Sequence, residues 1–134
     1  HCFDWPTAWY SVRAGSSYHT TGGNVINAET ITNHPSYNPD TAEYDISIVF
    51  LVSSLTFSAG VATIPLPEQD QYTPEGSRAV VSGWGALTEG GSSPIQLQAV
   101  GVPIVSNERC AALYQVLGWA VTDSMLCAGY DEGG

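Results

Sequence analysis

The sequence predicts an all-β protein with one short helix. Short runs rich in Val, Ile, Thr and aromatic residues recur at close intervals. Turn-forming residues separate these runs, with 14 glycines and 8 prolines in 134 residues. Only one segment has both the length and the composition of a helix. Short strands at this spacing are typical of a β-sandwich or a β-barrel.

Three strands are expected in the first half of the chain. Residues 9–15 read as a strand that runs into a turn at Gly15. Residues 24–38 are rich in β-branched side chains, and the strand is expected to end at His34–Pro35. Residues 45–52 form a short, nearly continuous apolar run. The length and the Ile and Val content of this run favour a buried strand over a helix.

The middle of the chain reads as a connection between two halves. Residues 58–77 contain three prolines and several polar side chains, which predicts a crossover on the surface. A strand over 78–85 follows and stops at Gly83 and Gly85. Residues 86–94 have the composition of a flexible loop.

The last part of the chain holds the helix. Residues 95–106 and 124–129 are expected to be strands, and residues 107–117 form the only plausible helix. Ser106 precedes this helix and is expected to be its N-cap.

The charge balance excludes two classes of partner. There are 13 acidic residues against three basic ones, and the net charge is −10. Binding to phosphate groups requires Lys and Arg, so we expect neither a nucleic acid partner nor adhesion to an anionic membrane. No stretch reaches the roughly 18 to 20 apolar residues needed to span a bilayer. A simple explanation of the acidity is solubility.

Three cysteines, at positions 2, 110 and 127, leave at least one without a partner in the chain if the other two pair. A bridge between Cys110 and Cys127 would enclose 16 residues. It would stabilise the fold by about 3 kcal/mol. Cys2 would then pair with a cysteine upstream of this chain, or it would be a free buried thiol.

Asp45 is the first candidate for chemistry because it stands directly before an apolar strand. A carboxylate buried there costs several kcal/mol unless a donor reaches it. Arg13 or a histidine could be that donor; alternatively, Asp45 caps a turn with its own side chain. Among the histidines, His19 reads as exposed and inert, and His34 reads as part of a turn.

Five segments together resemble trypsin-like serine proteases of the chymotrypsin fold, with the closest likeness to invertebrate trypsins. Each segment alone is a weak signal, but their order and the cysteine spacing are specific. They are "HC" (1–2), "TAEYDISIV" (41–49), "SGWG" (82–85), "VPIVSNERC" (102–110) and "DSMLCAGYDEGG" (123–134).

The resemblance implies a fold of two six-stranded antiparallel β-barrels. This chain would hold the second part of barrel 1 and the first part of barrel 2. The implied boundaries are 1–64 for the C-terminal part of the first barrel, 65–77 for the inter-barrel crossover and 78–134 for the N-terminal part of the second barrel.

The resemblance also implies a catalytic site. His1 matches the general base of a Ser-His-Asp triad, and Asp45 matches the aspartate that orients the base. The nucleophilic serine and the base of the specificity pocket match positions beyond Gly134. Tyr114 matches a tyrosine that packs behind that pocket.

The same resemblance pairs Cys110 with Cys127 and pairs Cys2 with an upstream cysteine. No cofactor is implied. Many vertebrate trypsins bind calcium in the loop that corresponds to residues 15–29, but Glu29 is the only carboxylate here. Because Ca²⁺ takes several oxygen ligands, mostly carboxylates, we expect no metal.

The expected function is a secreted serine endopeptidase that cleaves after Arg or Lys. Its partners would be protein or peptide substrates, the remaining segments of the same protease and protein inhibitors. One alternative is a protease-fold protein that has lost activity and acts as a binding module; another is chymotrypsin-like or elastase-like specificity. The absence of lysine has a second explanation besides solubility, which is resistance to self-digestion.

Overall fold

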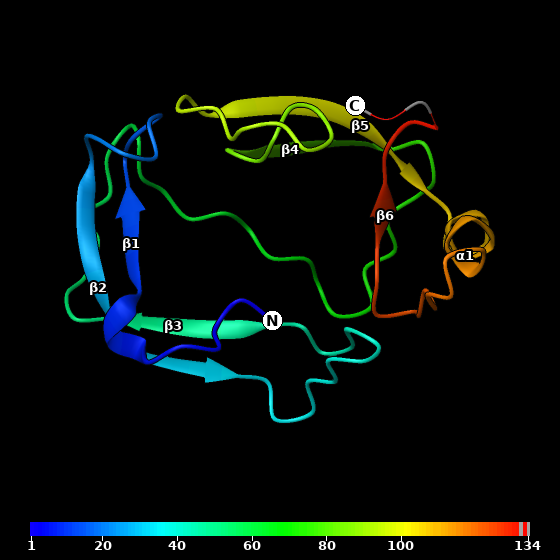
Figure 1. Ribbon diagram of the computed structural model, residues 1–134, viewed down its shortest axis with the longest axis horizontal. Coiled ribbons are helices and arrows are strands. Elements are labelled where there is room, and N and C mark those ends of the chain that lie inside the picture. The colour runs from blue at the N-terminus through cyan, green and yellow to red at the C-terminus, as the bar shows by residue number, and fades with distance from the viewer. Residues whose placement is uncertain (132, 134) are drawn as a thin grey trace.

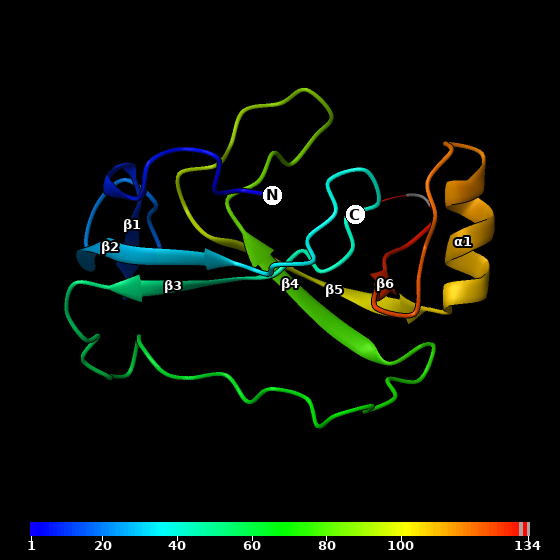
Figure 2. The same ribbon diagram turned by 90° about the horizontal axis from the view of Figure 1, so that it is seen from below.

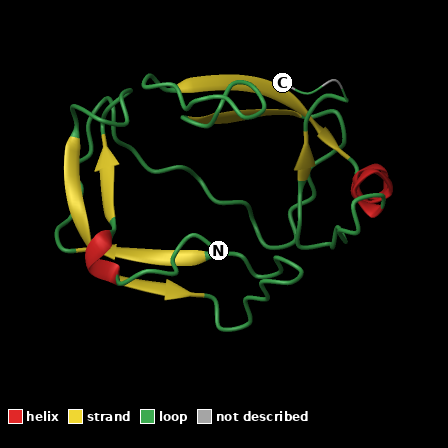
Figure 3. Cartoon of the chain, in the orientation of Figure 1, coloured by secondary structure: helices red, strands yellow, loops and turns green. Residues whose placement is uncertain are grey.

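The computed structural model describes residues 1–131 and 133 (Figure 1). These residues form two three-stranded antiparallel sheets, one α-helix and one short 3₁₀ turn (Figure 3). The prediction of an all-β chain with one short helix is confirmed. The end of the last sequence motif, at positions 132 and 134, lies outside the described residues.

The first sheet has the order β1-β2-β3, with β1 at Ser11–Ala14, β2 at Asn24–Asn33 and β3 at Ser47–Leu51. The long central strand pairs with β1 through its first four residues and with β3 through the rest. A register irregularity between Ala28 and Thr30 lies within the part that pairs with β3. Such irregularities bend and twist a strand.

The second sheet has the order β4-β5-β6, with β4 at Arg78–Gly83, β5 at Gln98–Val105 and β6 at Cys127–Ala128. The helix α1, Asn107–Gln115, follows β5 directly. It lies at the opposite end of the molecule from β2 (Figure 2).

Several predicted strands are longer than the observed ones. β2 ends at Asn33, directly before the predicted end at His34–Pro35. β1 begins at Ser11 because Thr7–Trp9 forms the 3₁₀ turn η1. Ser106 stands at the N-cap position of α1, but its side chain makes no capping hydrogen bond.

The prediction that the strand at 45–52 is buried is wrong. In β3, Val49 and Leu51 are half-buried, whereas Ile48 and Phe50 are 58% and 52% exposed. A continuous apolar run is buried on both faces only if a layer covers each face. Among the described residues, burial is concentrated on one face of β3, and the core is small: Ala28, Val102, Ile104 and Cys110.

The two sheets meet where residues 17–19 pair with residues 95–97, which we call the inter-sheet junction. The main-chain N–H of Leu97 donates to the Ser17 carbonyl oxygen at 2.7 Å. The indole N–H of Trp84 donates to the same oxygen at 3.2 Å. Residues 95–97 belong to the predicted strand 95–106, but no local pattern in the sequence indicates their partner.

Arg13 holds the loop that forms one side of this junction. Its guanidinium donates to the carbonyl oxygens of His19 at 3.1 Å, Thr20 at 3.3 Å and Gly22 at 2.5 Å. One cationic side chain therefore gathers three main-chain acceptors, and hydrogen bonds from charged donors are the stronger kind. His19 is exposed, as expected.

Candidate active site

His1 and Asp45 form a bonded pair although 44 residues separate them in the sequence. The ring nitrogen Nδ1 of His1 lies 2.5 Å from Oδ2 of Asp45, and the main-chain nitrogen of His1 donates to Oδ1 at 2.7 Å. An ionised carboxylate only accepts hydrogen bonds, so Nδ1 carries the proton. This bond fixes the ring orientation and leaves Nε2 as the basic nitrogen.

Both oxygens of Asp45 are thus engaged by one residue. The alternative in which Asp45 caps its own turn does not describe this geometry. Arg13, the other donor considered, points to the carbonyl groups of its own loop instead. The pairing with a histidine is the arrangement that the structure contains.

The expected burial of Asp45 is wrong. Its side chain is 28% exposed, and that of His1 is 68% exposed. Asp45 stands at the end of a turn in which Ala42 and Tyr44 have positive φ angles of 55° and 56°. Because β3 begins only at Ser47, this turn leaves the carboxylate at the rim of the sheet.

The turn that carries Asp45 is held by its own contacts. The rings of His34 and Tyr44 stack with centroids 4.8 Å apart. The main-chain N–H of Ser36 donates to Nδ1 of His34 at 3.1 Å. As expected, His34 belongs to the turn.

The surroundings of Asp45 favour positive charge. The pKa of Tyr37 is raised by loss of solvent around the phenol and, next, by the negative charges of Asp45 and Asp4. The negative charge of Asp45, which contributes to the Tyr37 shift, also stabilises an imidazolium at His1.

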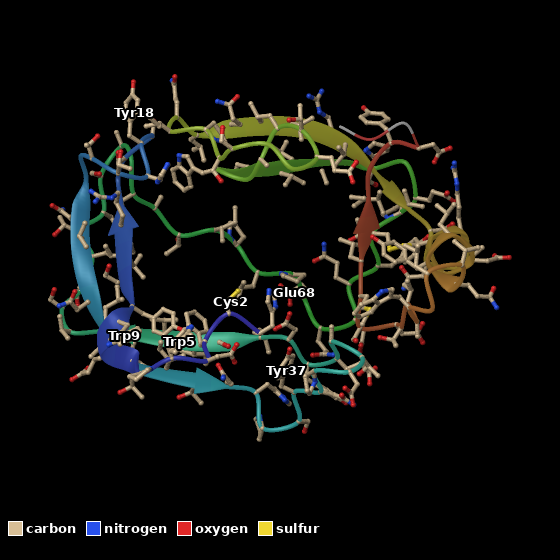
Figure 4. The ribbon with its side chains drawn as sticks, viewed as in Figure 1. Cys2, Trp5, Trp9, Tyr18, Tyr37 and Glu68 are labelled. Carbon is tan, nitrogen blue, oxygen red and sulfur yellow. A yellow bond between two sulfur atoms is a disulfide. The ribbon has the colours of Figure 1, made fainter. Side chains whose placement is uncertain are left out.

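Hydrogen bonds and an aromatic stack hold the segment that follows His1 in a compact conformation. The hydroxyl of Tyr10 donates to the Cys2 carbonyl oxygen at 3.2 Å and accepts from the Trp5 N–H at 3.1 Å. The rings of Trp5 and Trp9 stack with centroids 5.6 Å apart (Figure 4). The sequence does not mark Tyr10 for this role, because a tyrosine after a short turn carries no distinctive signal.

The thiol of Cys2 is exposed, and its Sγ lies 3.3 Å from Nε2 of His1. The structure therefore does not support a free thiol that is buried. The pairing of Cys2 with a cysteine upstream of this chain stays a prediction.

The disulfide between Cys110 and Cys127 is present and ties α1 to β6. Cys110 is 3% exposed, the lowest value in the small core. Tyr114 is 47% exposed and lines a hollow of about 380 Å³ together with Leu126 and Tyr130. Its suggested support of a specificity pocket stays a prediction.

Asn107, at the start of α1, is a positioning residue that the sequence analysis did not identify. Its side-chain amide donates to the carbonyl oxygens of Thr122 and Met125, each at 3.2 Å. These bonds fix the segment that the disulfide encloses. An Asn after a Ser at a helix start is too common to signal such a role.

Within residues 1–131 and 133, no three His, Cys, Asp or Glu side chains come together in a way that could hold a metal ion. Glu29 lies on β2. The helix α1, with nine residues, is too short to cross a membrane, and no other helix in the described part of the chain is long and apolar enough.

Comparisons with known proteins agree with this fold. A family profile described as "Trypsin" matches residues 1–134. The chain is 39% identical over 134 residues to trypsin 5G1 of Aedes aegypti and 37% identical over 134 residues to a trypsin of Simulium vittatum. It covers all of its own length in both matches, but only 50% and 54% of those proteins.

A vitellin-degrading protease of Bombyx mori is 37% identical over 125 residues, which is 93% of this chain and 47% of that protein. The chain thus spans about half the length of the curated relatives it matches. Among solved structures, an inactivated protease paralogue of the scabies mite aligns with a TM-score of 0.89 at 21% identity. That alignment covers 97% of this chain and 57% of the other, and it shows the shared fold.

Proposed function

The chain belongs to the trypsin family, and on that premise we propose that it is half of the catalytic domain of a secreted serine endopeptidase. In this proposal His1 is the general base and Asp45 orients it. The enzyme cleaves protein or peptide substrates after Arg or Lys. The nucleophilic serine comes from the remaining segments of the same protease.

The observation that carries the proposal is the double engagement of Asp45 by His1. With Nδ1 protonated and held at 2.5 Å from the carboxylate, Nε2 is the nitrogen that can accept the proton of a serine hydroxyl. The serine oxygen then attacks the substrate carbonyl, and the imidazolium is stabilised by Asp45. His1 returns the proton to the leaving amine, and water completes the hydrolysis by the same route.

The proposed division of the chain follows the two sheets. Residues 1–64 contain β1 to β3, and residues 78–134 contain β4 to β6 and α1. Between them, residues 65–77 contain no strand or helix. This distribution supports one barrel on each side of an inter-barrel crossover.

Two features support trypsin-like specificity. Relatives at 37% to 39% identity are named as trypsins. The net charge of −10 creates a field that attracts basic peptides. Tyr114 is proposed to support the pocket that receives the basic side chain. Chymotrypsin-like or elastase-like specificity is the competing assignment.

A second candidate function is a binding module without activity. The scabies mite structure that shares this fold is described as an inactivated protease paralogue. The fold alone is therefore compatible with either role. The His1–Asp45 pair favours the enzyme, because a module that only binds has no need of an oriented base.

The test uses the complete protease that contains this chain, in active form. Asp45→Asn removes the acceptor charge and favours the wrong ring tautomer. We expect turnover of an Arg amide substrate to fall about 10⁴-fold, the loss known for this substitution in a Ser-His-Asp triad. Asp40→Asn, in the same turn, is the matched control and should keep normal turnover.

Unchanged turnover in Asp45→Asn would refute the role of the pair. Circular dichroism of both variants checks that the fold is retained. Rates on matched Arg, Phe and Ala substrates decide the specificity. A protease-fold protein that hydrolyses none of them, and whose serine does not react with a fluorophosphonate, would be the binding module.

A further inference from the structure

The basic residues of this chain are few and unevenly placed. The sequence has three arginines and no lysine. Arg13 lies in β1, Arg78 in β4 and Arg109 in α1, so all three stand in regular elements. The connecting segments contain neither Arg nor Lys; these are residues 1–10, 15–23, 34–46, 52–77, 84–97 and 116–126.

The acidic residues show the opposite distribution. Among the acidic residues that the structure describes, only Glu29 and Glu108 lie in a strand or in α1. The other acidic residues that the structure describes lie in connecting segments, for example Asp70 and Glu89, or follow β6, as Asp131 does. These segments therefore accept charged side chains readily. What they lack is positive charge.

Each arginine is also held by hydrogen bonds of its side chain or by pairing of its main chain. The guanidinium of Arg13 donates to three loop carbonyl groups, and its main chain pairs with Val25 of β2. The guanidinium of Arg109 bonds to the Asp131 carboxylate at 2.5 Å. The next residue along the chain is Cys110, which is held in the disulfide.

Arg78 is held in a different way. Its main chain pairs with Pro103 in the sheet. Its guanidinium lies over Gly101, with Nε and Nη2 both 2.7 Å from the position that a Cβ of residue 101 would take. A side chain laid flat on the neighbouring strand has to leave that strand before it can enter a protease pocket.

A protease acts on a segment that can become extended in its cleft, so a bond inside a sheet or helix must first open locally. We propose that the connecting segments of this chain lack cleavage sites for its own activity, and that the active protease thereby resists self-digestion in this half. The proposal rests on the Arg/Lys specificity proposed above. The reaction avoided is simple hydrolysis, in which one peptide C–N bond breaks while the carbonyl carbon gains OH and the nitrogen gains H from one water.

The alternative explanation, that the acidic composition serves solubility, accounts less well for the positions of the arginines. It accounts for a negative net charge, but it does not account for where the remaining arginines stand. If only net charge mattered, a few basic residues in segments that already carry several carboxylates would be tolerated. Self-digestion selects against such residues in accessible segments and tolerates them in strands and in α1.

The experiment places a lysine in a connecting segment of the complete active protease. Ser92→Lys lies in the segment 84–97, and Ser92→Gln is its uncharged control. Thr32→Lys adds the same charge on the exposed surface of β2. A second segment variant, Gln69→Lys, guards against a local folding effect at residue 92.

Each enzyme is incubated alone at high concentration, and residual activity and peptide masses are followed. We expect Ser92→Lys and Gln69→Lys to lose activity about tenfold faster than wild type, with cuts directly after the new lysines. Ser92→Gln and Thr32→Lys should behave as wild type. Equal loss in all five proteins without cuts at residues 92 and 69, or cuts in the wild type after Arg13, Arg78 or Arg109 while the enzyme is folded, would overturn the inference.

The initial rate on a small Arg substrate distinguishes failure of the self-digestion inference from failure of the proposed Arg/Lys specificity. If wild type hydrolyses that substrate and the lysine variants are no less durable, only the self-digestion inference fails. If wild type hydrolyses a Phe or Ala substrate but not an Arg substrate, the proposed specificity fails and the inference fails with it.

Discussion

The disulfide between Cys110 and Cys127 should contribute a large and measurable part of the stability of the second sheet. The perturbation is the double substitution Cys110→Ala and Cys127→Ala in the complete protease. The cysteines are 17 residues apart in sequence. For a loop of this length, the chain-entropy model gives a loss of about 3 kcal/mol.

The structure indicates where this loss should appear. β6 has only two residues, which pair with Ile104 and Val105 of β5, and the next residue, Gly129, donates its N–H to the Pro103 carbonyl oxygen. Such a short strand contributes little pairing energy of its own. Without the disulfide, residues 106–131 should open locally before the rest of the protein unfolds.

Thermal unfolding in the presence of an active-site inhibitor measures the effect without self-digestion. For a domain of 150 to 250 residues, a loss of about 3 kcal/mol corresponds to a fall in Tm of roughly 6 to 12 °C. Hydrogen exchange should accelerate in residues 106–131 and much less in β2. Ser124→Ala, inside the enclosed segment, is the control and should cost less than about 1 kcal/mol.

A fall of less than about 2 °C in the double variant would refute this reasoning, since it corresponds to under 1 kcal/mol. It would mean that α1 and β6 are held by the Asn107 bonds and packing, and that the disulfide adds little constraint. Equal acceleration of exchange in β2 and in residues 106–131 would contradict the predicted local opening.

Two further predictions concern the loop at the inter-sheet junction. Gly23→Ala should destabilise by roughly 2 kcal/mol or more, because Gly23 has φ +60° and an added Cβ would lie 2.2 Å from the Ala14 carbonyl oxygen. The control is Gly90→Ala, where φ is +66° and the space is open, and it should cost about 1 to 2 kcal/mol. Urea titration measures both variants, and an equal loss of stability in the two would show that the overlap at Gly23 is relieved. Arg13→Gln should accelerate hydrogen exchange in residues 15–23 by about tenfold, as expected when charge-assisted bonds are lost, while exchange in β3 stays unchanged; unaltered exchange in the loop would show that the guanidinium does not hold it.

The sequence was sufficient to locate the strands and α1, because their signals are local. Alternating β-branched residues and the glycines and prolines between them depend on no distant partner. The predicted ends of the strands were less accurate. The strand predicted at 95–106 is observed only over 98–105, whereas β2 stops at Asn33, next to the end predicted from Pro35.

Long-range contacts were the part that local patterns could not reveal. The bonds between residues 17–19 and 95–97 join main-chain groups, which every residue carries. The three acceptors of Arg13 are also carbonyl groups, so no side chain marks them. The pairing of His1 with Asp45 was predicted only because several motifs together resembled a family.

The burial expected for Asp45 is not observed in this chain, which spans about half the length of its relatives. An apolar run after a carboxylate suggests that both are in a core. In the structure the positive φ angles of Ala42 and Tyr44 turn the chain before β3 starts, and the carboxylate stays at the rim. A backbone turn of this kind depends on conformation at non-glycine residues, which composition does not signal.

The inter-sheet junction also has a consequence for how the chain folds. β1–β2 and β4–β5 are hairpin-like pairs of sequence neighbours, whereas the contact from Trp84 to Ser17 spans 67 residues. Contacts of long sequence separation form late, because the chain between them must lose its freedom first. Doubling the length of a flexible loop adds only about 0.6 kcal/mol to that cost. The connecting segment 52–77 should therefore tolerate insertions with little change in equilibrium stability, and refolding should be limited by the encounter of two sheets that have already formed.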